Sequence, residues 1–144
     1  MNLEQVKFLA RDLMDQHNLT DWKLDFNDAV RRFGYCAYWR KIISISKPLS
    51  LLNNESRVRN TILHEIAHAL TKSGHDKAFY KKCIEIGAEP KRCYPESVIR
   101  PEPKHIYACS TCGYRYERIK KIKRHKLSYH GACGPKKGSL VKIK

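Results

Sequence analysis

One five-residue pattern, His64-Glu65-Ile66-Ala67-His68, constrains this 144-residue chain more than any other feature of its sequence. Residues four positions apart lie one turn apart on the same face of an α-helix, so the imidazoles of His64 and His68 can bind one metal ion together. Glu65 lies roughly 100° around the helix from His64 and about 60° from His68. Its carboxylate would therefore lie beside the metal rather than on it. The pattern predicts a zinc peptidase helix, and the alternative is a surface helix with two solvated histidines.

The flanking residues support a helix. Asn53-Asn54 followed by Glu55-Ser56 is typical of a helix N-terminus with an acidic residue in its first turn. Both histidines fall outside the apolar stripe, so we expect them to face a cleft. Gly74 is the expected helix stop. Apolar residues recur at helical spacing at Val58, Ile62, Ile66, Ala69 and Leu70.

His75 is the predicted third zinc ligand. A catalytic zinc needs three protein ligands and one open position, and a glycine turn after the helix can bring His75 back toward the metal. The alternative is a cation favoured by the helix macrodipole. Zinc on these three histidines would lower the pKa of a water bound to it, and Glu65 would take the proton and pass it to the leaving amine. Six residues separate His68 from His75, whereas the metzincin signature has five.

The run from His64 to Leu70, followed by Gly74-His75 and Phe79, resembles the SprT-like zinc metalloproteases, which include the DNA–protein crosslink protease Spartan. Upstream, Trp22-Lys23-Leu24, Phe33-Gly34 and residues 42–46 are similar to that family's strands before the active-site helix. The resemblance extends from about Leu3 to the C-terminus. It implies an α+β, zincin-like metallopeptidase domain with helices packed on a small antiparallel sheet. The implied activity is zinc-dependent endopeptidase cleavage of DNA-associated or DNA-crosslinked proteins.

The C-terminal part of the chain differs in composition. Residues 105–144 carry 11 Lys and Arg against one acidic residue, Glu117. Pro95, Pro101 and Pro103 mark the boundary, because such a stretch can form neither a helix nor a central strand. We therefore divide the chain into a catalytic domain over residues 1–98, a Pro-rich linker over 99–106 and a basic domain over 107–144.

Four residues of the basic domain predict a second zinc site. Cys109 and Cys112 form a C-x-x-C pair, His130 and Cys133 form an H-x-x-C pair, and a glycine follows each pair. The spacing is typical of a zinc ribbon. SprT-like proteins often carry such a ribbon with four cysteines, so His130 stands in a cysteine position and His125 is the alternative ligand. We expect two zinc ions per chain, one catalytic and one structural.

A basic strip lies within the predicted ribbon, with Tyr114, Tyr116 and Tyr129 around it. Dense cations next to aromatic rings suit a phosphate backbone and exposed bases. A solvated basic loop is the alternative. We predict binding to single- or double-stranded DNA without sequence specificity, through Arg118, Lys120, Lys121, Lys123, Arg124 and Lys126.

The expected location is intracellular. No stretch is apolar enough to span a membrane, and residues 1–18 show an amphipathic helix rather than a signal peptide. The six cysteines are therefore expected as reduced thiols and metal ligands, with Cys36, Cys83 and Cys93 as core or incidental residues. We predict a monomeric cytoplasmic protein, nuclear or nucleoid-associated if bound to DNA, that binds protein substrates and no membrane.

Three other functions fit parts of the sequence. The first is a nucleic-acid-binding protein with a structural zinc and no peptidase activity, against which Glu65 argues, since a structural site has no use for a general base. The second is a regulatory, repressor-cleaving peptidase that is independent of DNA. The third is a transcription-associated or assembly factor in which both zinc sites only support contacts.

Overall fold

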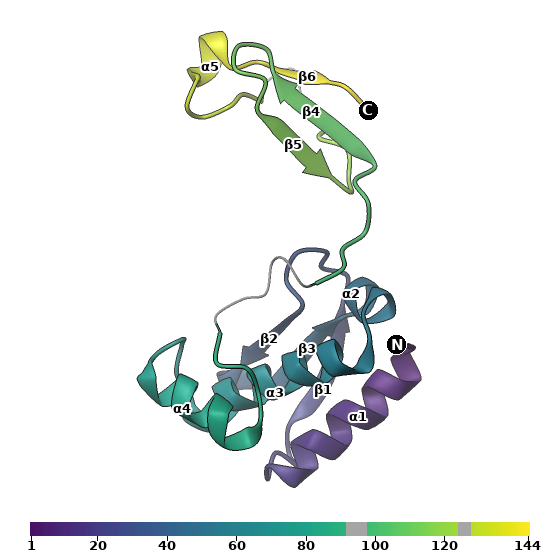
Figure 1. Ribbon diagram of the computed structural model, residues 1–144, viewed down its shortest axis with the longest axis vertical. Coiled ribbons are helices and arrows are strands. Elements are labelled where there is room, and N and C mark those ends of the chain that lie inside the picture. The colour runs from purple at the N-terminus through teal and green to yellow at the C-terminus, as the bar shows by residue number, and fades with distance from the viewer. Residues whose placement is uncertain (92–97, 124–127) are drawn as a thin grey trace. The chain divides into compact units, whose positions relative to one another are not determined.

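The computed structural model describes residues 1–91, 98–123 and 128–144 of the chain. The chain divides into two compact units, Met1–Arg100 and Pro101–Lys144 (Figure 1). Several residues that the sequence analysis singled out lie outside the described residues, namely Cys93, Pro95, Arg124, His125 and Lys126.

The N-terminal unit is built from helices packed on a three-stranded sheet, and α1 and α3 lie on the same side of it (Figure 1). No helix among the described residues is both long and apolar enough to cross a lipid bilayer. Its elements are α1 (Leu3–Gln16), β1 (Lys23–Asn27), β2 (Gly34–Ala37), the 3-10 turn η1 (Tyr38–Arg40), β3 (Ile42–Ser46), α2 (Lys47–Leu52), α3 (Glu55–Thr71) and α4 (Lys77–Ile86).

The sheet has the strand order β1-β3-β2 and is mixed. β2 and β3 pair antiparallel, as expected for strands joined by a short connection, but β1 and β3 pair parallel, with Leu24 opposite Ile43. This corrects the expectation of a purely antiparallel sheet. The chain reverses direction between β1 and β2 and again between β2 and β3, so β1 and β3 run the same way. They become neighbours because β3, whose residues Ile43, Ser44, Ile45 and Ser46 are all buried, takes the centre of the sheet. The predicted α+β architecture, with helices packed on a small sheet, is otherwise confirmed.

α3 is the helix predicted from the H-E-x-x-H segment. The Asn54 side chain accepts a hydrogen bond from the Arg57 amide and caps its first turn. Val58, Ile62, Ile66 and Ala69 are buried as the periodicity predicted, whereas Leu70 is exposed. The predicted stop at Gly74 was wrong, because the helix ends earlier, at Thr71, and Lys72 adopts the left-handed conformation at φ 50°.

The N-terminal unit extends past the predicted catalytic domain. The buried Asn53 side chain accepts a hydrogen bond from the Ile99 amide at 2.9 Å and donates one to the Ile99 carbonyl at 2.9 Å. These bonds hold residues 98–100 against the start of α3. Ile99 and Arg100 therefore belong to the first unit, although they fall in the expected linker over 99–106.

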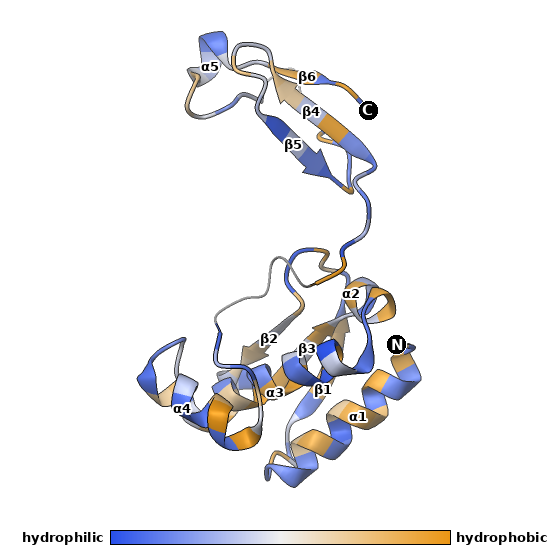
Figure 2. Cartoon of the chain, in the orientation of Figure 1, coloured by the Kyte–Doolittle hydropathy of each residue, from blue (hydrophilic) through white to orange (hydrophobic). Residues whose placement is uncertain are grey.

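The C-terminal unit is a small antiparallel sheet with the order β5-β4-β6. Tyr107 is fully buried and, with Ile106, Cys109 and Leu140, forms its modest core. In Figure 2, β4 carries hydrophobic residues while β5 is hydrophilic, so one strand supplies most of the apolar contact. The elements are β4 (His105–Cys109), β5 (Arg115–Arg118), α5 (Gly134–Lys137) and β6 (Leu140–Lys142).

Candidate active site

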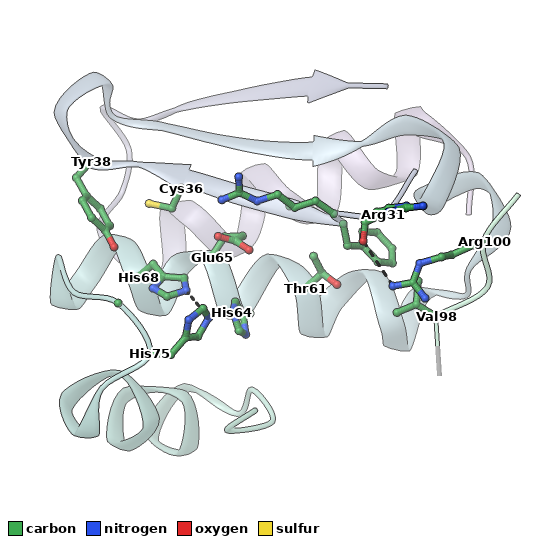
Figure 3. Close-up of a pocket in the computed structure, with 14 residues that line it drawn as sticks. Arg31, Cys36, Tyr38, Thr61, His64, Glu65, His68, His75, Val98 and Arg100 are labelled. Atoms are coloured by element: carbon green, nitrogen blue, oxygen red, sulfur yellow. Dashed lines mark hydrogen bonds between the residues drawn. The ribbon is translucent and has the colours of Figure 1, made fainter. Parts of the chain in front are cut away.

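The three histidines predicted as ligands converge on one point. The Nε2 atom of His75 lies 3.2 Å from Nε2 of His64 and 3.3 Å from Nε2 of His68. A tetrahedral zinc with Zn–N bonds of 2.0–2.1 Å places two nitrogens about 3.3 Å apart. The donor atoms therefore have the spacing that a zinc ion requires. His64 and His68 come from α3, and the turn between α3 and α4 brings His75 back to them (Figure 3).

Phe79 of α4 forms the floor beneath these rings. It is fully buried and stacks on His68 at a centroid distance of 4.2 Å, with His64 at 4.8 Å and His75 at 5.0 Å. Phe79 belongs to the hydrophobic core, and its ring also contacts the histidines. Each histidine ring is thus restrained by the same aromatic side chain.

Burial favours the neutral form of His64 and His68, the two histidines on α3. Desolvation, followed by the charges of His68 and His75, lowers the pKa of His64 to about 3. Desolvation also lowers the pKa of His68, against a hydrogen bond to the Ser73 carbonyl that raises it. Since a carbonyl oxygen only accepts, His68 carries its proton on Nδ1, which lies 2.8 Å from the Ser73 oxygen. The Nε2 lone pair of His68 is therefore available for a metal, which is the arrangement typical of ligating histidines.

Glu65 lies beside the cluster and is only 6% exposed. Burial raises its pKa to about 8, against the opposing effect of the Arg32 charge. The backbone of Gly34 on β2 packs directly against it, because a Cβ atom at Gly34 would lie 3.1 Å from the Glu65 Cγ. The glycine of the predicted Phe33-Gly34 segment thus permits the close approach of β2 to α3.

A cleft of about 490 Å³ contains this site. Figure 3 shows His68, His75 and Tyr38 toward one end, and Arg31 and Arg100 toward the other. Thr61 and Glu65 lie four residues apart on α3, so the cleft follows one face of this helix. Several residues that line the cleft belong to no recognisable sequence motif, namely Arg31, Arg32, Tyr38, Thr61, Val98 and Arg100.

Cys36 also lines the cleft, although it was expected to be a core or incidental residue. It is half-buried, and desolvation together with the Glu65 charge raises its pKa to about 12. The thiol is therefore protonated at neutral pH and is not a nucleophile. Cys83 is buried in the core as expected.

The second predicted cluster also comes together, in the C-terminal unit. Nδ1 of His130 lies 3.3 Å from the Cys112 sulfur and 3.4 Å from the Cys133 sulfur. Bond lengths of about 2.3 Å to sulfur and 2.0–2.1 Å to nitrogen would place such atoms about 3.5 Å apart around a tetrahedral zinc. The donor set of Cys109, Cys112, His130 and Cys133 therefore fits a structural zinc. The rival ligand His125 lies outside the described residues.

Local backbone geometry explains the repeated glycine of this cluster. Gly113 and Gly134 follow the two pairs and have φ angles of 74° and 77°, a region that favours glycine. The backbone amide of Cys112 donates to the Cys109 sulfur and lowers the pKa of Cys109 to about 6. A hydrogen bond with Cys112 raises the pKa of Cys133 to about 11. The first thiol is therefore prepared as a thiolate, the form that binds metal.

The basic strip is only partly within the described residues. Its described members, Arg118, Lys120, Lys121 and Lys123, are all exposed. Tyr114 and Tyr129 are 55% and 48% exposed, and the ring of Tyr114 stacks on His130 at 4.8 Å.

Comparisons with known proteins agree with this site and fold. The sequence model of the SprT-like family matches residues 4–99. A protein named SprT-like from Oceanobacillus iheyensis is 26% identical over 145 residues, which cover 92% of this chain and 93% of that protein. One from Staphylococcus saprophyticus is 32% identical over 95 residues, covering 62% of this chain and 59% of that protein. The first match is 145 residues long and therefore extends beyond the N-terminal unit, Met1–Arg100.

A solved structure resembles the fold. The metallopeptidase zymogen jannalysin of Methanocaldococcus jannaschii superposes with a TM-score of 0.50 at 17% sequence identity. The match covers 56% of this chain and 79% of that one. It supports the assignment of the fold class.

Proposed function

Because the chain belongs to the SprT-like family, we propose that it is a zinc-dependent endopeptidase. Its active site would be the cluster of His64, His68 and His75 with Glu65 beside it. One observation carries the proposal: three ring nitrogens converge, with spacings of 3.2 Å and 3.3 Å from His75, in the same cleft as a buried carboxylate. A site that only stabilised the fold would need no such carboxylate.

The residues of the chain have distinct tasks in this proposal. Zinc, when bound, would lower the pKa of a water molecule and polarise a peptide carbonyl. The three histidines hold the metal through Nε2. Glu65 takes the proton from the attacking water and later gives it to the leaving amine. Its pKa of about 8 without metal would fall beside a divalent cation, so the carboxylate can act as a base near neutral pH.

Substitution of Glu65 tests the proposal. Glu65→Gln keeps the shape of the side chain but cannot accept a proton, so we expect cleavage of an unfolded protein substrate to fall by about 10²-fold or more while zinc is retained. Glu4→Gln, at an exposed position on α1, is the matched control and should cleave at the parent rate. Equal rates for Glu65→Gln and the parent would remove Glu65 from the mechanism. A zinc-loaded parent that cleaved nothing would favour the nucleic-acid-binding alternative.

We further propose that the basic unit brings the peptidase to DNA, so that DNA-associated or DNA-crosslinked proteins are its substrates. The excess of basic residues after residue 104 and the exposure of Lys120, Lys121 and Lys123 support this step. Exposed Tyr114 and Tyr129 are suited to stacking on bases. Binding would rest on phosphate contacts and would weaken steeply with salt.

A matched pair of triple variants separates DNA binding from general charge. Replacing Lys120, Lys121 and Lys123 with Gln should weaken DNA binding and flatten its dependence on salt. The control replaces three exposed lysines of the other unit with Gln and removes the same charge: Lys7, Lys77 and Lys81. Equal DNA affinity for the two triple variants would identify the strip as a solvated face. Equal cleavage of free and DNA-bound substrates would then favour the regulatory peptidase.

A further inference from the structure

Tyr38 links the two walls of the cleft. It begins the η1 turn between β2 and β3, and its hydroxyl donates a hydrogen bond of 2.6 Å to the backbone carbonyl of Ser73. Ser73 lies 35 residues further along the chain, in the turn between α3 and α4. Figure 3 places Tyr38 at the end of the cleft next to His68. The bond therefore ties the sheet side of the cleft to the turn that carries His75.

The Ser73 carbonyl also accepts a hydrogen bond from His68, whose Nδ1 lies 2.8 Å from the same oxygen. A carbonyl oxygen has two lone pairs, so the hydroxyl of Tyr38 and the ring of His68 together use its capacity. Two donors on one acceptor do not strengthen each other. The Tyr38 bond therefore acts by fixing the direction of the carbonyl, and that direction sets the plane of the His68 ring.

The remainder of the turn is held from the helix side. Lys72 donates from its amide to the His68 carbonyl at 2.8 Å, and the Ser73 hydroxyl lies 3.1 Å from a carboxylate oxygen of Asp76. The same Asp76 oxygen accepts from the Phe79 amide at 2.9 Å and caps α4. These bonds connect the turn to α3 and α4. The hydrogen bond from Tyr38 holds the same turn from the opposite side of the cleft.

We propose that Tyr38 is a positioning residue for the three-histidine cluster, acting through the Ser73 carbonyl on His68 and on the turn that carries His75. The inference rests on the proposed zinc function. Loss of a partner that orients a metal-binding histidine typically reduces metal affinity by about 10- to 100-fold. Tyr38 acts through one intervening group, so the expected effect is at the lower end, about 10-fold.

The test compares Tyr38→Phe with Tyr35→Phe in the zinc-loaded full chain. Both changes keep the aromatic ring and remove a hydroxyl. Tyr35 contacts Arg32 through its ring, whose centroid lies 5.1 Å from the guanidinium carbon. Zinc release to a chelator is followed over time, and His75→Ala identifies the phase that belongs to the three-histidine cluster. We expect Tyr38→Phe to accelerate that phase about 10-fold. Tyr35→Phe should leave it unchanged, and neither should alter release from the cysteine cluster.

Nitrogen NMR of the histidine rings supplies a readout that does not depend on activity. In the parent, the Nδ1–H signal of His68 should be sharp and protected from solvent exchange. Faster exchange of this signal in Tyr38→Phe, and not in Tyr35→Phe, is the expected result. Equal zinc release and equal exchange in the two variants would overturn the role of Tyr38 alone. A parent that releases zinc only from the cysteine cluster would overturn the proposed function, and with it this inference.

Discussion

Glu65 on α3 and Gly34 on β2 are packed so closely that a Cβ atom at position 34 would lie 3.1 Å from the Glu65 Cγ. The same Cβ would lie 3.2 Å from the Ile45 side chain and 3.2 Å from the Ser44 carbonyl oxygen. The backbone oxygen cannot move away easily. A side chain at position 34 must therefore displace Glu65 or Ile45.

This packing predicts that Gly34→Ala impairs cleavage more than it impairs folding. We expect kcat to fall by about 10-fold or more, because small displacements of a catalytic group can cost a large part of the rate. The free energy of unfolding should fall by about 1–3 kcal/mol. Gly74→Ala is the control, since a Cβ there would meet no atom within 4 Å. Peptidase assays and zinc analysis of both variants check this, and a Gly34→Ala protein with unchanged kcat would contradict it.

The raised pKa of Glu65 predicts an effect of pH on the stability of the metal-free protein. The unfolded state ionises near the ordinary pKa of 4.5, whereas the folded state keeps the proton until about 8. Rising pH in this window therefore favours the unfolded state, and the destabilisation is complete above pH 8. Glu65→Gln removes this contribution. The variant should exceed the parent in stability by a margin that grows from pH 5 to pH 8, to on the order of 4 kcal/mol.

Tryptophan fluorescence can follow this unfolding in the full chain. The chain has two tryptophans, Trp22 and Trp39, and both belong to the N-terminal unit. His64, whose pKa is lowered, destabilises both proteins alike as pH falls below its ordinary value of 6.5, so it cancels in the difference. A margin that stayed constant between pH 5 and pH 8 would show that Glu65 ionises normally in the folded state.

The parts of the structure that depend on local sequence were predictable. The periodicity of α3, its Asn54 cap and the four-residue spacing of His64 and His68 are all properties of one continuous segment. The pairing of Cys109-Cys112 with His130-Cys133 rests on two local turns of the same kind. In both cases the sequence pattern corresponds directly to the geometry of one helix or one loop.

The parts that depend on distant segments were not predictable in this way. The parallel pairing of β1 with β3 depends on which strand takes the centre of the sheet. The hydrogen bond from Tyr38 to Ser73 joins segments 35 residues apart, and no local sequence pattern predicts it. Arg100 reaches the cleft because Asn53 holds the neighbouring Ile99, 46 residues away. The end of α3 was misplaced because Lys72, rather than a glycine, adopts the left-handed conformation.

Asn53 should therefore matter more than an average asparagine. It is 4% exposed, donates to the Leu49 and Ile99 carbonyls and accepts from the Ile99 amide. Asn53→Ala removes all three hydrogen bonds, of which the bond to Leu49 is buried and the two to Ile99 are partly buried, and we expect a loss of about 2–4 kcal/mol in the free energy of unfolding. The neighbouring Asn54→Ala removes only the cap of α3 and should cost about 1 kcal/mol. Denaturant unfolding followed by fluorescence compares the two, and equal losses would show that the Ile99 contact adds no stability.

The fourth ligand of the cysteine cluster gives the last prediction. The C-terminal unit has few large buried residues, chiefly Ile106, Tyr107 and Leu140, so its fold should depend on zinc. His130→Ala removes a nitrogen that lies 3.3 Å and 3.4 Å from two sulfurs, and we expect loss of one zinc per chain together with unfolding of this unit. His130→Cys supplies a thiolate in its place and should retain the metal. His125→Ala is the matched control and should keep both zinc and fold. Elemental analysis with NMR of the backbone amides distinguishes these outcomes, and zinc loss on His125→Ala with retention on His130→Ala would reverse the assignment.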